Sequence, residues 1–264
     1  MNLFDAHCHL QDERLSPDLS GAMQRAAQVG VQRFLCCGSS EQDWPQVAAL
    51  CGQYPQVLPA FGLHPWYIRN RSTEWLAHLT RALSDTSAIV GEIGLDHVVD
   101  PRNDDEQESA FIAQLHLARQ LNRPAAIHCR RAWEHLLAVL KKTGPLPRGF
   151  MIHSYSGGHE LIKPLTELGA YFSFSGSITR SGNKRGHHAA REVPTDRLLI
   201  ETDAPDLSPV IRDGDRTFEP AVNEPVNLQY VVAALAELRG TDSNQIAEVT
   251  WNNACRLYGV TNSS

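Results

Sequence analysis

Short apolar runs alternate with longer segments in which apolar residues recur at spacings of three and four. The runs have the length of buried strands, and the longer segments have the period of a helix that packs on one face. Eight runs predict strands at 3–7, 33–37, 58–63, 88–93, 125–129, 149–153, 170–175 and 198–202. The clearest helices are predicted at 109–121, 133–141, 161–168, 226–239 and 243–258.

Repeated alternation of strand and helix is typical of a parallel sheet covered by helices. Eight such units in 264 residues predict an α/β protein of the (β/α)8 TIM-barrel class. A doubly wound open sheet is the alternative. We find no internal repeat, low-complexity tract or linker, so we expect a single domain over 1–264, with a long loop at 208–225 after the last strand.

Composition narrows the class of protein. Hydrophobic residues make up 42% of the chain, and no stretch approaches the roughly 18 apolar residues of a membrane helix. The first residues lack the basic and apolar regions of a signal peptide, so we expect a cytoplasmic protein without membrane contact. The formal net charge of −6 argues against tight binding of long duplex DNA as the main activity, although a bound cation can attract phosphate locally.

The cysteines have neither the spacing of a disulfide framework nor that of a Cys-x-x-Cys zinc site. In a cytoplasmic protein of this size we expect them to be reduced and buried. The six are Cys8, Cys36, Cys37, Cys51, Cys129 and Cys255.

Histidines and carboxylates stand at the C-terminal ends of six of the eight predicted strands. In a barrel these ends meet at one face, where active sites are built. We therefore predict that side chains from distant parts of the chain gather around divalent metal ions. The predicted ligands are His7, His9, Glu92, His128, His153 and Asp203, with His64 following the third strand.

The pair His7 and His9 is a strong local signal, because residues two apart on a strand point to the same side. Two solvated histidines are the alternative. Glu92 lies in an apolar run, where a carboxylate is costly unless it is coordinated or forms a core salt bridge. His128 and His153 occupy equivalent positions on neighbouring strands, which favours ligands over structural histidines.

Imidazole and carboxylate donors together suit Zn, Mn, Ni or Fe, and also Mg where water completes the shell. The chain has no P-loop, no dinucleotide-binding glycine pattern and no Gly-x-Ser-x-Gly motif. Hydrolysis by a metal-activated water is the simplest remaining chemistry.

Eight short motifs follow one another along the chain: Asp-Ala-His-Cys-His (5–9), Gly-Leu-His-Pro (62–65), Gly-Glu-Ile-Gly-Leu-Asp (91–96), His-Cys-Arg (128–130), His-Ser-Tyr-Ser-Gly (153–157), Phe-Ser-Gly-Ser (174–177), Glu-Thr-Asp-Ala-Pro (201–205) and Asn-Glu-Pro (223–225). In this order the set resembles the signatures of the TatD family of metal-dependent deoxyribonucleases, in the amidohydrolase superfamily. The resemblance runs from residue 5 to about 225, which is essentially the whole chain.

The resemblance implies a (β/α)8 barrel of the metal-dependent hydrolase type with two divalent ions (Mg, Mn, Zn or Ni). One ion would be held by His7, His9, Glu92 and Asp203, and the other by Glu92, His128 and His153. It also implies deoxyribonuclease activity, often 3′–5′ exonuclease action, with DNA ends or short single-stranded DNA as substrate.

Three features depart from the family pattern. His97 and Val98 follow the Gly-Leu-Asp motif where an aromatic residue is common, and Tyr155 stands where Phe is usual. The segment 179–188 is unusually basic and rich in glycine.

The other polar side chains receive roles within this reaction. We expect Asp203 to accept a proton from water and to pass it to the leaving oxygen. His64 and Arg130 are candidates for gripping the phosphate, with a surface position at a helix start as the alternative for Arg130. Asp96 is expected to support Glu92 or His128, and Glu201, which faces the opposite way on its strand, is expected to support the ligands or to be purely structural.

Two other functions fit the same residues: hydrolysis of a small amide, lactone or ester, and a non-catalytic scaffold stabilised by metal. The complete ligand set argues against the scaffold. No obligate protein partner is evident. A last basic group is either a rim for a nucleic-acid strand or a solvated helix face: Arg180, Lys184, Arg185, His187 and His188.

Overall fold

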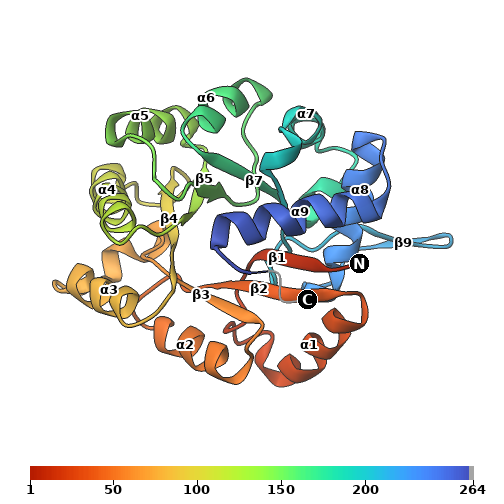
Figure 1. The fold of residues 1–264 in the computed structure, drawn as a ribbon, viewed down its shortest axis with the longest axis horizontal. Helices are drawn as coiled ribbons and strands as arrows, with labels where there is room; N and C mark the ends of the chain where they lie inside the picture. The colour runs from red at the N-terminus through yellow and green to blue at the C-terminus, as the bar shows by residue number, and fades with distance from the viewer. Residues whose placement is uncertain (262–264) are drawn as a thin grey trace. The chain divides into compact units, whose positions relative to one another are not determined.

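The computed structural model describes residues 1–261, in which eight parallel strands alternate with helices (Figure 1). The strands are hydrogen-bonded in sequence order, whereas a doubly wound sheet reverses its strand order. The predicted (β/α)8 fold is therefore confirmed. The strands are β1 Leu3–Cys8, β2 Val31–Cys37, β3 Val57–Phe61, β4 Ile89–Asp96, β5 Ala125–Arg130, β6 Phe150–Ile152, β7 Ala170–Phe174 and β8 Leu198–Ile200.

The helices follow the strands as the apolar periodicity predicts. The α-helices are α1 Leu19–Gln28, α2 Trp44–Gln53, α3 Trp75–Ser84, α4 Asp104–Gln120, α5 Trp133–Thr143, α6 Ile162–Glu167, α7 Lys184–Glu192, α8 Leu228–Arg239 and α9 Ser243–Tyr258. Short 3-10 helices are η1 Ser16–Asp18, η2 Pro65–Asn70, η3 His159–Leu161, η4 Gly176–Thr179, η5 Thr195–Arg197 and η6 Pro225–Asn227.

The chain forms two compact units, each with its own set of neighbouring strands. Unit 1 comprises 1–36, 154–162 and 172–261, and unit 2 comprises 37–153 and 163–171. Unit 1 contains β1, β8, most of β2 and most of β7, and unit 2 contains β3 to β6. The expectation of one domain over the whole chain stays a prediction.

In unit 1, the first and last strands lie side by side. The N–H of Asp203, just after β8, donates to the His7 carbonyl at 3.0 Å, and the His9 N–H donates to the Ala204 carbonyl at 2.8 Å. The buried Asp5 carboxylate accepts the Thr202 N–H at 2.8 Å. These bonds hold the segment after β8 against the C-terminal end of β1.

Helix α9 packs on β1 and β8 and covers their apolar side (Figure 1). The Phe4 ring of β1 lies 5.5 Å from the Tyr258 ring and 6.1 Å from the Trp251 ring, centroid to centroid. The Tyr258 hydroxyl donates to the Ala6 carbonyl at 3.1 Å. This aromatic cluster of unit 1 therefore joins a residue near the start of the chain to two residues of its last helix.

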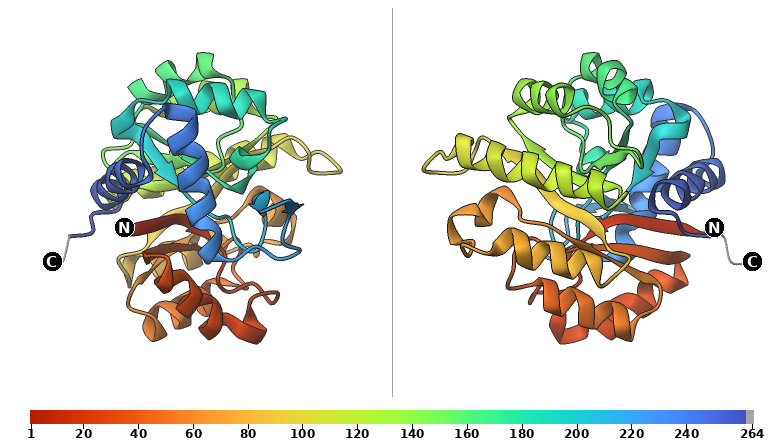
Figure 2. Two further views of the ribbon diagram at one scale, coloured as in Figure 1. Left: turned by 90° about the vertical axis from the view of Figure 1, so that its right-hand side faces the viewer. Right: turned by 60° about the vertical axis from the view of Figure 1, so that its left-hand side comes forward.

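In unit 2, the long helix α4 packs on β4 (Figure 2). Two buried glutamines of α4 bond to the strand ends: Gln107 Oε1 accepts the Asp96 N–H at 2.7 Å, and Gln114 Oε1 accepts the Leu63 N–H at 2.7 Å. Between β4 and β5, Gly94 lies opposite His128 and Asp96 opposite Arg130. The two strands therefore bring their C-terminal residues together at one end of unit 2.

Two predictions were wrong in part. The loop predicted at 208–225 contains an antiparallel hairpin of β9 Ile211–Asp213 and β10 Arg216–Phe218. The six cysteines form no disulfide, but only five are buried, because Cys51 lies on a partly exposed turn of α2. No helix within 1–261 is both long and apolar enough to cross a bilayer.

Candidate metal centre

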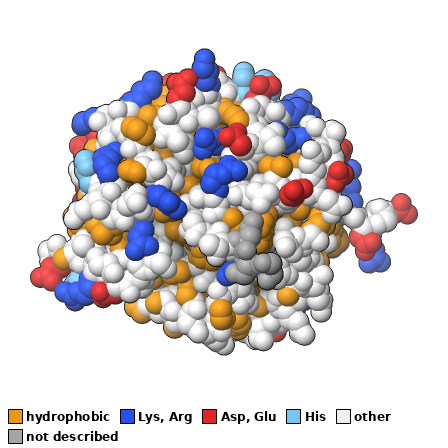
Figure 3. Space-filling model, viewed as in Figure 1, with side chains coloured by type: hydrophobic (Ala, Val, Ile, Leu, Met, Phe, Trp, Pro, Cys, Tyr) orange, Lys and Arg blue, Asp and Glu red, His pale blue; other side chains and the backbone are white. Residues whose placement is uncertain are grey.

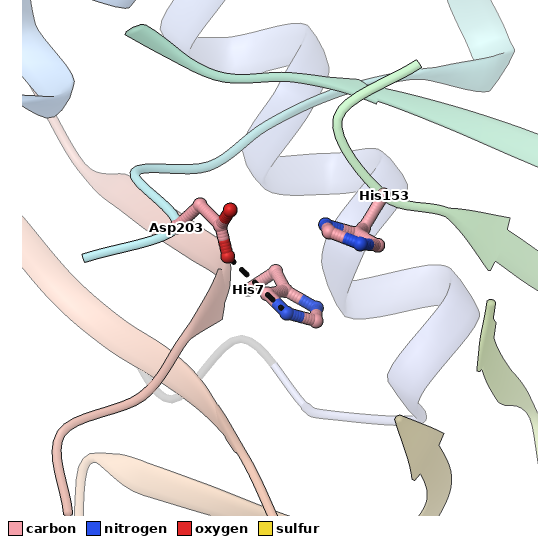
Figure 4. A group of neighbouring side chains, drawn as sticks. All are labelled: His7, His153 and Asp203. Carbon is pink, nitrogen blue, oxygen red and sulfur yellow. Dashed lines mark ion pairs between the residues drawn. The ribbon is translucent and has the colours of Figure 1, made fainter. Parts of the chain in front are cut away.

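In unit 1, three predicted ligands meet at the C-terminal ends of β1 and β8. His7 is fully buried and Asp203 is 8% exposed. His7 Nε2 lies 3.2 Å from His9 Nε2 and 3.6 Å from Asp203 Oδ1, and His9 Nε2 lies 3.5 Å from the same carboxylate oxygen. Figure 4 shows the Asp203 carboxylate turned towards the His7 ring. We call these three residues the unit 1 triad.

The backbone around Asp203 explains its position. Its φ of +57° lies in the left-handed region that a non-glycine residue rarely adopts, and its N–H is bonded to the His7 carbonyl. Such strain persists only where the surroundings impose it, and it is concentrated at functional sites. The turn after β8 therefore directs the Asp203 carboxylate back to the histidines of β1.

In unit 2, the other three predicted ligands meet around one carboxylate oxygen. Glu92 Oε1 lies 2.8 Å from His153 Nε2 and 3.1 Å from His128 Nδ1, and these two ring nitrogens lie 3.0 Å apart. Glu92 is only 3% exposed, so its charge requires a compensating group. We call Glu92, His128 and His153 the unit 2 triad.

The spacing of the donor atoms fits metal ligation. The unit 1 triad has edges of 3.2, 3.5 and 3.6 Å. Ligands of a tetrahedral ion with bonds of about 2.1 Å stand about 3.4 Å apart. The unit 2 triad has edges of 2.8, 3.0 and 3.1 Å. Adjacent ligands of an octahedral ion stand about 3.0 Å apart. Each triad can therefore present three donors to one cation.

His64 lies beside the unit 2 triad. Its Nε2 is 3.4 Å from Glu92 Oε1, and donor atoms of His64, Glu92 and His128 lie close enough for a shared ion. Burial lowers the pKa of His64 to about 4, so its ring is neutral at physiological pH. Its predicted role in gripping phosphate stays a prediction, and the structure adds it as a further candidate ligand.

Asp96 contacts a ring nitrogen of the predicted ligand His128, and its supporting role stays a prediction. Its Oδ2 lies 3.2 Å from His128 Nε2, the ring nitrogen that does not face Glu92. Burial alone would raise the pKa of Asp96, but hydrogen bonds from His128, Trp66 and the Val98 N–H outweigh it and lower that pKa. The carboxylate stays ionised and orients the imidazole.

Glu201 and Arg130 are placed differently. Glu201 is buried, and its Oε1 accepts the N–H of Ser154, the residue after His153, at 2.6 Å. Arg130 ends β5 with an exposed side chain. The roles of Glu201 in support and of Arg130 in phosphate binding stay predictions.

The residues that depart from the family pattern, in the part of the chain that the structure describes, contact neighbouring side chains or backbone groups. His97 Nε2 lies 3.2 Å from His135 Nδ1, and the Tyr155 hydroxyl donates to the Gly158 carbonyl at 2.7 Å. In the basic segment, Arg180 forms an ion pair with Glu219 at 2.8 Å. On the face drawn in Figure 3, basic side chains are dispersed, and several lie beside acidic ones. The pairing of Arg180 weakens the interpretation of that segment as a rim for nucleic acid.

Sequence reasoning missed Trp66, which follows the Gly-Leu-His-Pro motif. Its indole Nε1 donates to Asp96 Oδ2 at 2.7 Å, although the two residues are 30 positions apart. The sequence shows an aromatic residue directly after the motif, but it contains no signal that this residue contacts Asp96.

Comparison with known proteins gives matches along the whole chain. The family described as TatD related DNase matches residues 4–259. The uncharacterized metal-dependent hydrolase YabD of Bacillus subtilis is 32% identical over 98% of this chain and 99% of its own. The 3′-5′ ssDNA/RNA exonuclease TatD of Escherichia fergusonii is 30% identical over 98% and 99%. The crystal structure of YjjV, a TatD homolog from Escherichia coli, superposes with a TM-score of 0.91 at 32% identity, over 98% of each chain.

Proposed function

The chain belongs to the TatD-related DNase family of metal-dependent hydrolases, and on this premise we propose that it is a phosphodiesterase that shortens single-stranded DNA from the 3′ end. The family match and the exonuclease name of one relative support this substrate. Small amides, lactones and esters are the competing substrates. The cytoplasmic location and the lack of an obligate protein partner stay predictions.

One observation carries the proposal: each unit assembles its own set of three donor atoms with the spacing of metal ligands. We propose that each triad holds one divalent ion. Nitrogen and oxygen donors of this kind suit Mn, Zn, Ni or Mg. No donor is a thiolate, and a site of imidazoles and carboxylates is typical of hydrolytic centres.

Ions held by the two triads would supply Lewis-acid chemistry, polarising a phosphoryl oxygen and making water a better nucleophile. Asp203 is the base in our proposal, because its carboxylate lies beside the unit 1 histidines and retains a small opening to solvent. It accepts the proton of the attacking water and returns it to the leaving 3′ oxygen. Asp96 holds the His128 ring in one orientation throughout.

The test is a substrate panel with the metal-reconstituted protein. Protein treated with a chelator and then loaded with Mg²⁺ or Mn²⁺ is incubated with single-stranded DNA, RNA, and small amides and lactones. We expect oligonucleotide cleavage that chelation abolishes and Mn²⁺ or Mg²⁺ restores.

Labels at either end of the oligonucleotide then give the polarity. Loss of single nucleotides from the 3′ end is the expected pattern. Turnover of an amide or lactone by loaded protein that leaves every oligonucleotide intact would overturn the proposal.

A further inference from the structure

Trp66 combines high exposure with a fixed position. The residue is 55% exposed, among the most exposed large hydrophobic residues within 1–261. Its indole Nε1 nevertheless donates to the buried Asp96 carboxylate at 2.7 Å, and its backbone N–H donates to His64 Nδ1 at 3.1 Å. Pro65 precedes it at the start of η2 and restricts the backbone further. Trp66 is therefore largely exposed to solvent while its indole Nε1 is held by a buried carboxylate.

The ring also lies next to the unit 2 triad. Its centroid is 5.0 Å from that of His64 and 6.4 Å from that of His128, at interplanar angles of 86° and 70°. One oxygen, Asp96 Oδ2, binds both Trp66 Nε1 and His128 Nε2, at 2.7 and 3.2 Å. A single buried carboxylate thus sets the position of an exposed aromatic surface relative to a candidate metal ligand.

Scattered exposed apolar side chains are normal and need no function. Trp66 differs because a side chain that only covered Asp96 would not need an aromatic face open to solvent. An indole held in place loses little entropy on binding a flat ring, and nucleobases stack on tryptophan with little dependence on sequence. Val98, 36% exposed, donates its N–H to the other oxygen of the same carboxylate, so Asp96 also fixes the apolar surface at this end of β4.

We propose that Trp66 is the stacking surface for a nucleobase of the substrate, next to the phosphodiester that is cleaved; this inference rests on the proposed nuclease function. The ligand class is a single-stranded nucleic acid with unpaired bases. Stacking is the recognition step, and it needs no hydrogen bond to the base edge. Asp96 is a positioning residue in this proposal, because it acts on the substrate through Trp66, besides its contact with His128.

The experiment compares intact and abasic substrates. Mn²⁺-loaded wild type, Trp66→Ala and Trp66→Phe are assayed on a single-stranded ten-residue deoxythymidylate and on versions with one abasic residue at the first, second or third position from the 3′ end. Leu76→Ala, which removes another exposed apolar side chain of unit 2, is the control. Metal content and thermal unfolding are measured for each protein, so that loss of ions or of folding is detected directly.

We expect at least one abasic position to lower kcat/KM of the wild type by about 5- to 150-fold, the range for one stacked base. Trp66→Ala should lose activity on the intact strand, mainly through KM, and should no longer distinguish that abasic strand. Trp66→Phe should keep most of the discrimination, and Leu76→Ala all of it.

A merely structural role would give a different result. If Trp66→Ala slows intact and abasic strands by the same factor, or Trp66→Phe loses as much discrimination as Trp66→Ala, the stacking proposal is overturned while the nuclease function stands. If the loaded wild type cleaves none of the strands, both proposals are overturned.

Discussion

At the residue scale, the candidate centre depends on which atom each side chain presents. His128 shows this most clearly, because its Nδ1 faces Glu92 and its Nε2 faces Asp96. Two carboxylates on opposite ring nitrogens hold the imidazole in one plane. Ligands oriented in this way bind a cation with less loss of conformational freedom.

Asp203→Asn tests the proposed base. The amide keeps the shape of the side chain but does not accept a proton, so we expect kcat on single-stranded DNA to fall by about 10²- to 10⁴-fold. The urea unfolding curve should stay close to that of the wild type. Asp206→Asn, in the same turn but more exposed, is the control and should keep full activity. A near-normal kcat for Asp203→Asn would refute the role.

Asp96→Asn tests the support of His128. The amide loses the charge that holds the His128 ring, and we expect the affinity for Mn²⁺ to fall by about 10- to 100-fold. Titration calorimetry of the metal-free protein measures it. Asp105→Asn, on the exposed side of α4, should bind Mn²⁺ as the wild type does. Equal affinities for all three proteins would show that Asp96 does not act on the centre.

At the element scale, the ligands are positioned by the register of strands and by the loops that follow them. Gly94 of β4 lies opposite His128 of β5, and the two strands approach closely at this point. A Cβ on Gly94 would stand 2.0 Å from the His128 carbonyl oxygen. The close approach sets the distance between the strand that carries Glu92 and the strand that carries His128.

Gly94→Ala should therefore be strongly destabilising. The backbone clash and the φ of +148° both oppose a side chain, and we expect the free energy of unfolding to fall by about 3 kcal/mol. Gly52→Ala in α2, whose Cβ would meet nothing within 4 Å, is the control and should gain about 0.5–1 kcal/mol. Urea denaturation measures both. Equal stability of the two variants would contradict the close approach.

Glu41 stabilises the loop between η2 and α3 by hydrogen bonds. Its carboxylate accepts the Ser72 N–H at 2.8 Å and the Ser72 hydroxyl at 2.7 Å, and lies 2.8 Å from His78 Nδ1. Burial alone would raise the pKa of Glu41, but these hydrogen bonds outweigh it and lower that pKa. The stabilisation is therefore present above the pKa of the unfolded chain and is lost as the pH falls through the lower pKa of the folded state.

Glu41→Gln should lower the free energy of unfolding by about 1 kcal/mol at neutral pH. The difference from wild type should shrink as the pH falls below about 4.5, where the carboxylate of the unfolded chain takes up its proton. Urea denaturation at a series of pH values tests this expectation. A difference that grows on acidification would contradict the assigned direction of the pKa shift.

At the scale of the whole molecule, the candidate metal ligands are divided between the two compact units. The unit 1 triad comes from the end of β1 and the segments that follow β1 and β8, and the unit 2 triad comes from β4, β5 and the residue after β6. Each set of contacts is complete within its own unit. This division predicts that substituting the histidines of one triad removes one bound ion and leaves the other triad able to bind its own.

We expect the wild type to bind two Mn²⁺ ions. The double variants His7→Ala/His9→Ala and His128→Ala/His153→Ala should each retain one, because each removes the nitrogen donors of one triad. Elemental analysis after dialysis gives the stoichiometry, and His116→Ala on the exposed side of α4 serves as control. A single ion in the wild type would contradict the two-ion arrangement.

The sequence by itself determined the order of strands and helices and the residue types at the strand ends. Local periodicity encodes these, since each apolar run reports only on its own burial. Helix α9, for example, has the predicted bounds Ser243–Tyr258. The family motifs added the ligand set, and the structure brings its members together within each unit.

Only the tertiary structure decided which atoms meet. Asp96 contacts both Trp66 and His128, which lie 30 and 32 positions away in the chain. Asp203 has a left-handed backbone conformation that turns its carboxylate towards His7. The apolar pattern also did not predict the hairpin of β9 and β10, because strands of three residues are too short to show alternating apolar and polar positions. Such contacts depend on the register between strands distant in the chain, which no local pattern of apolar and polar residues contains.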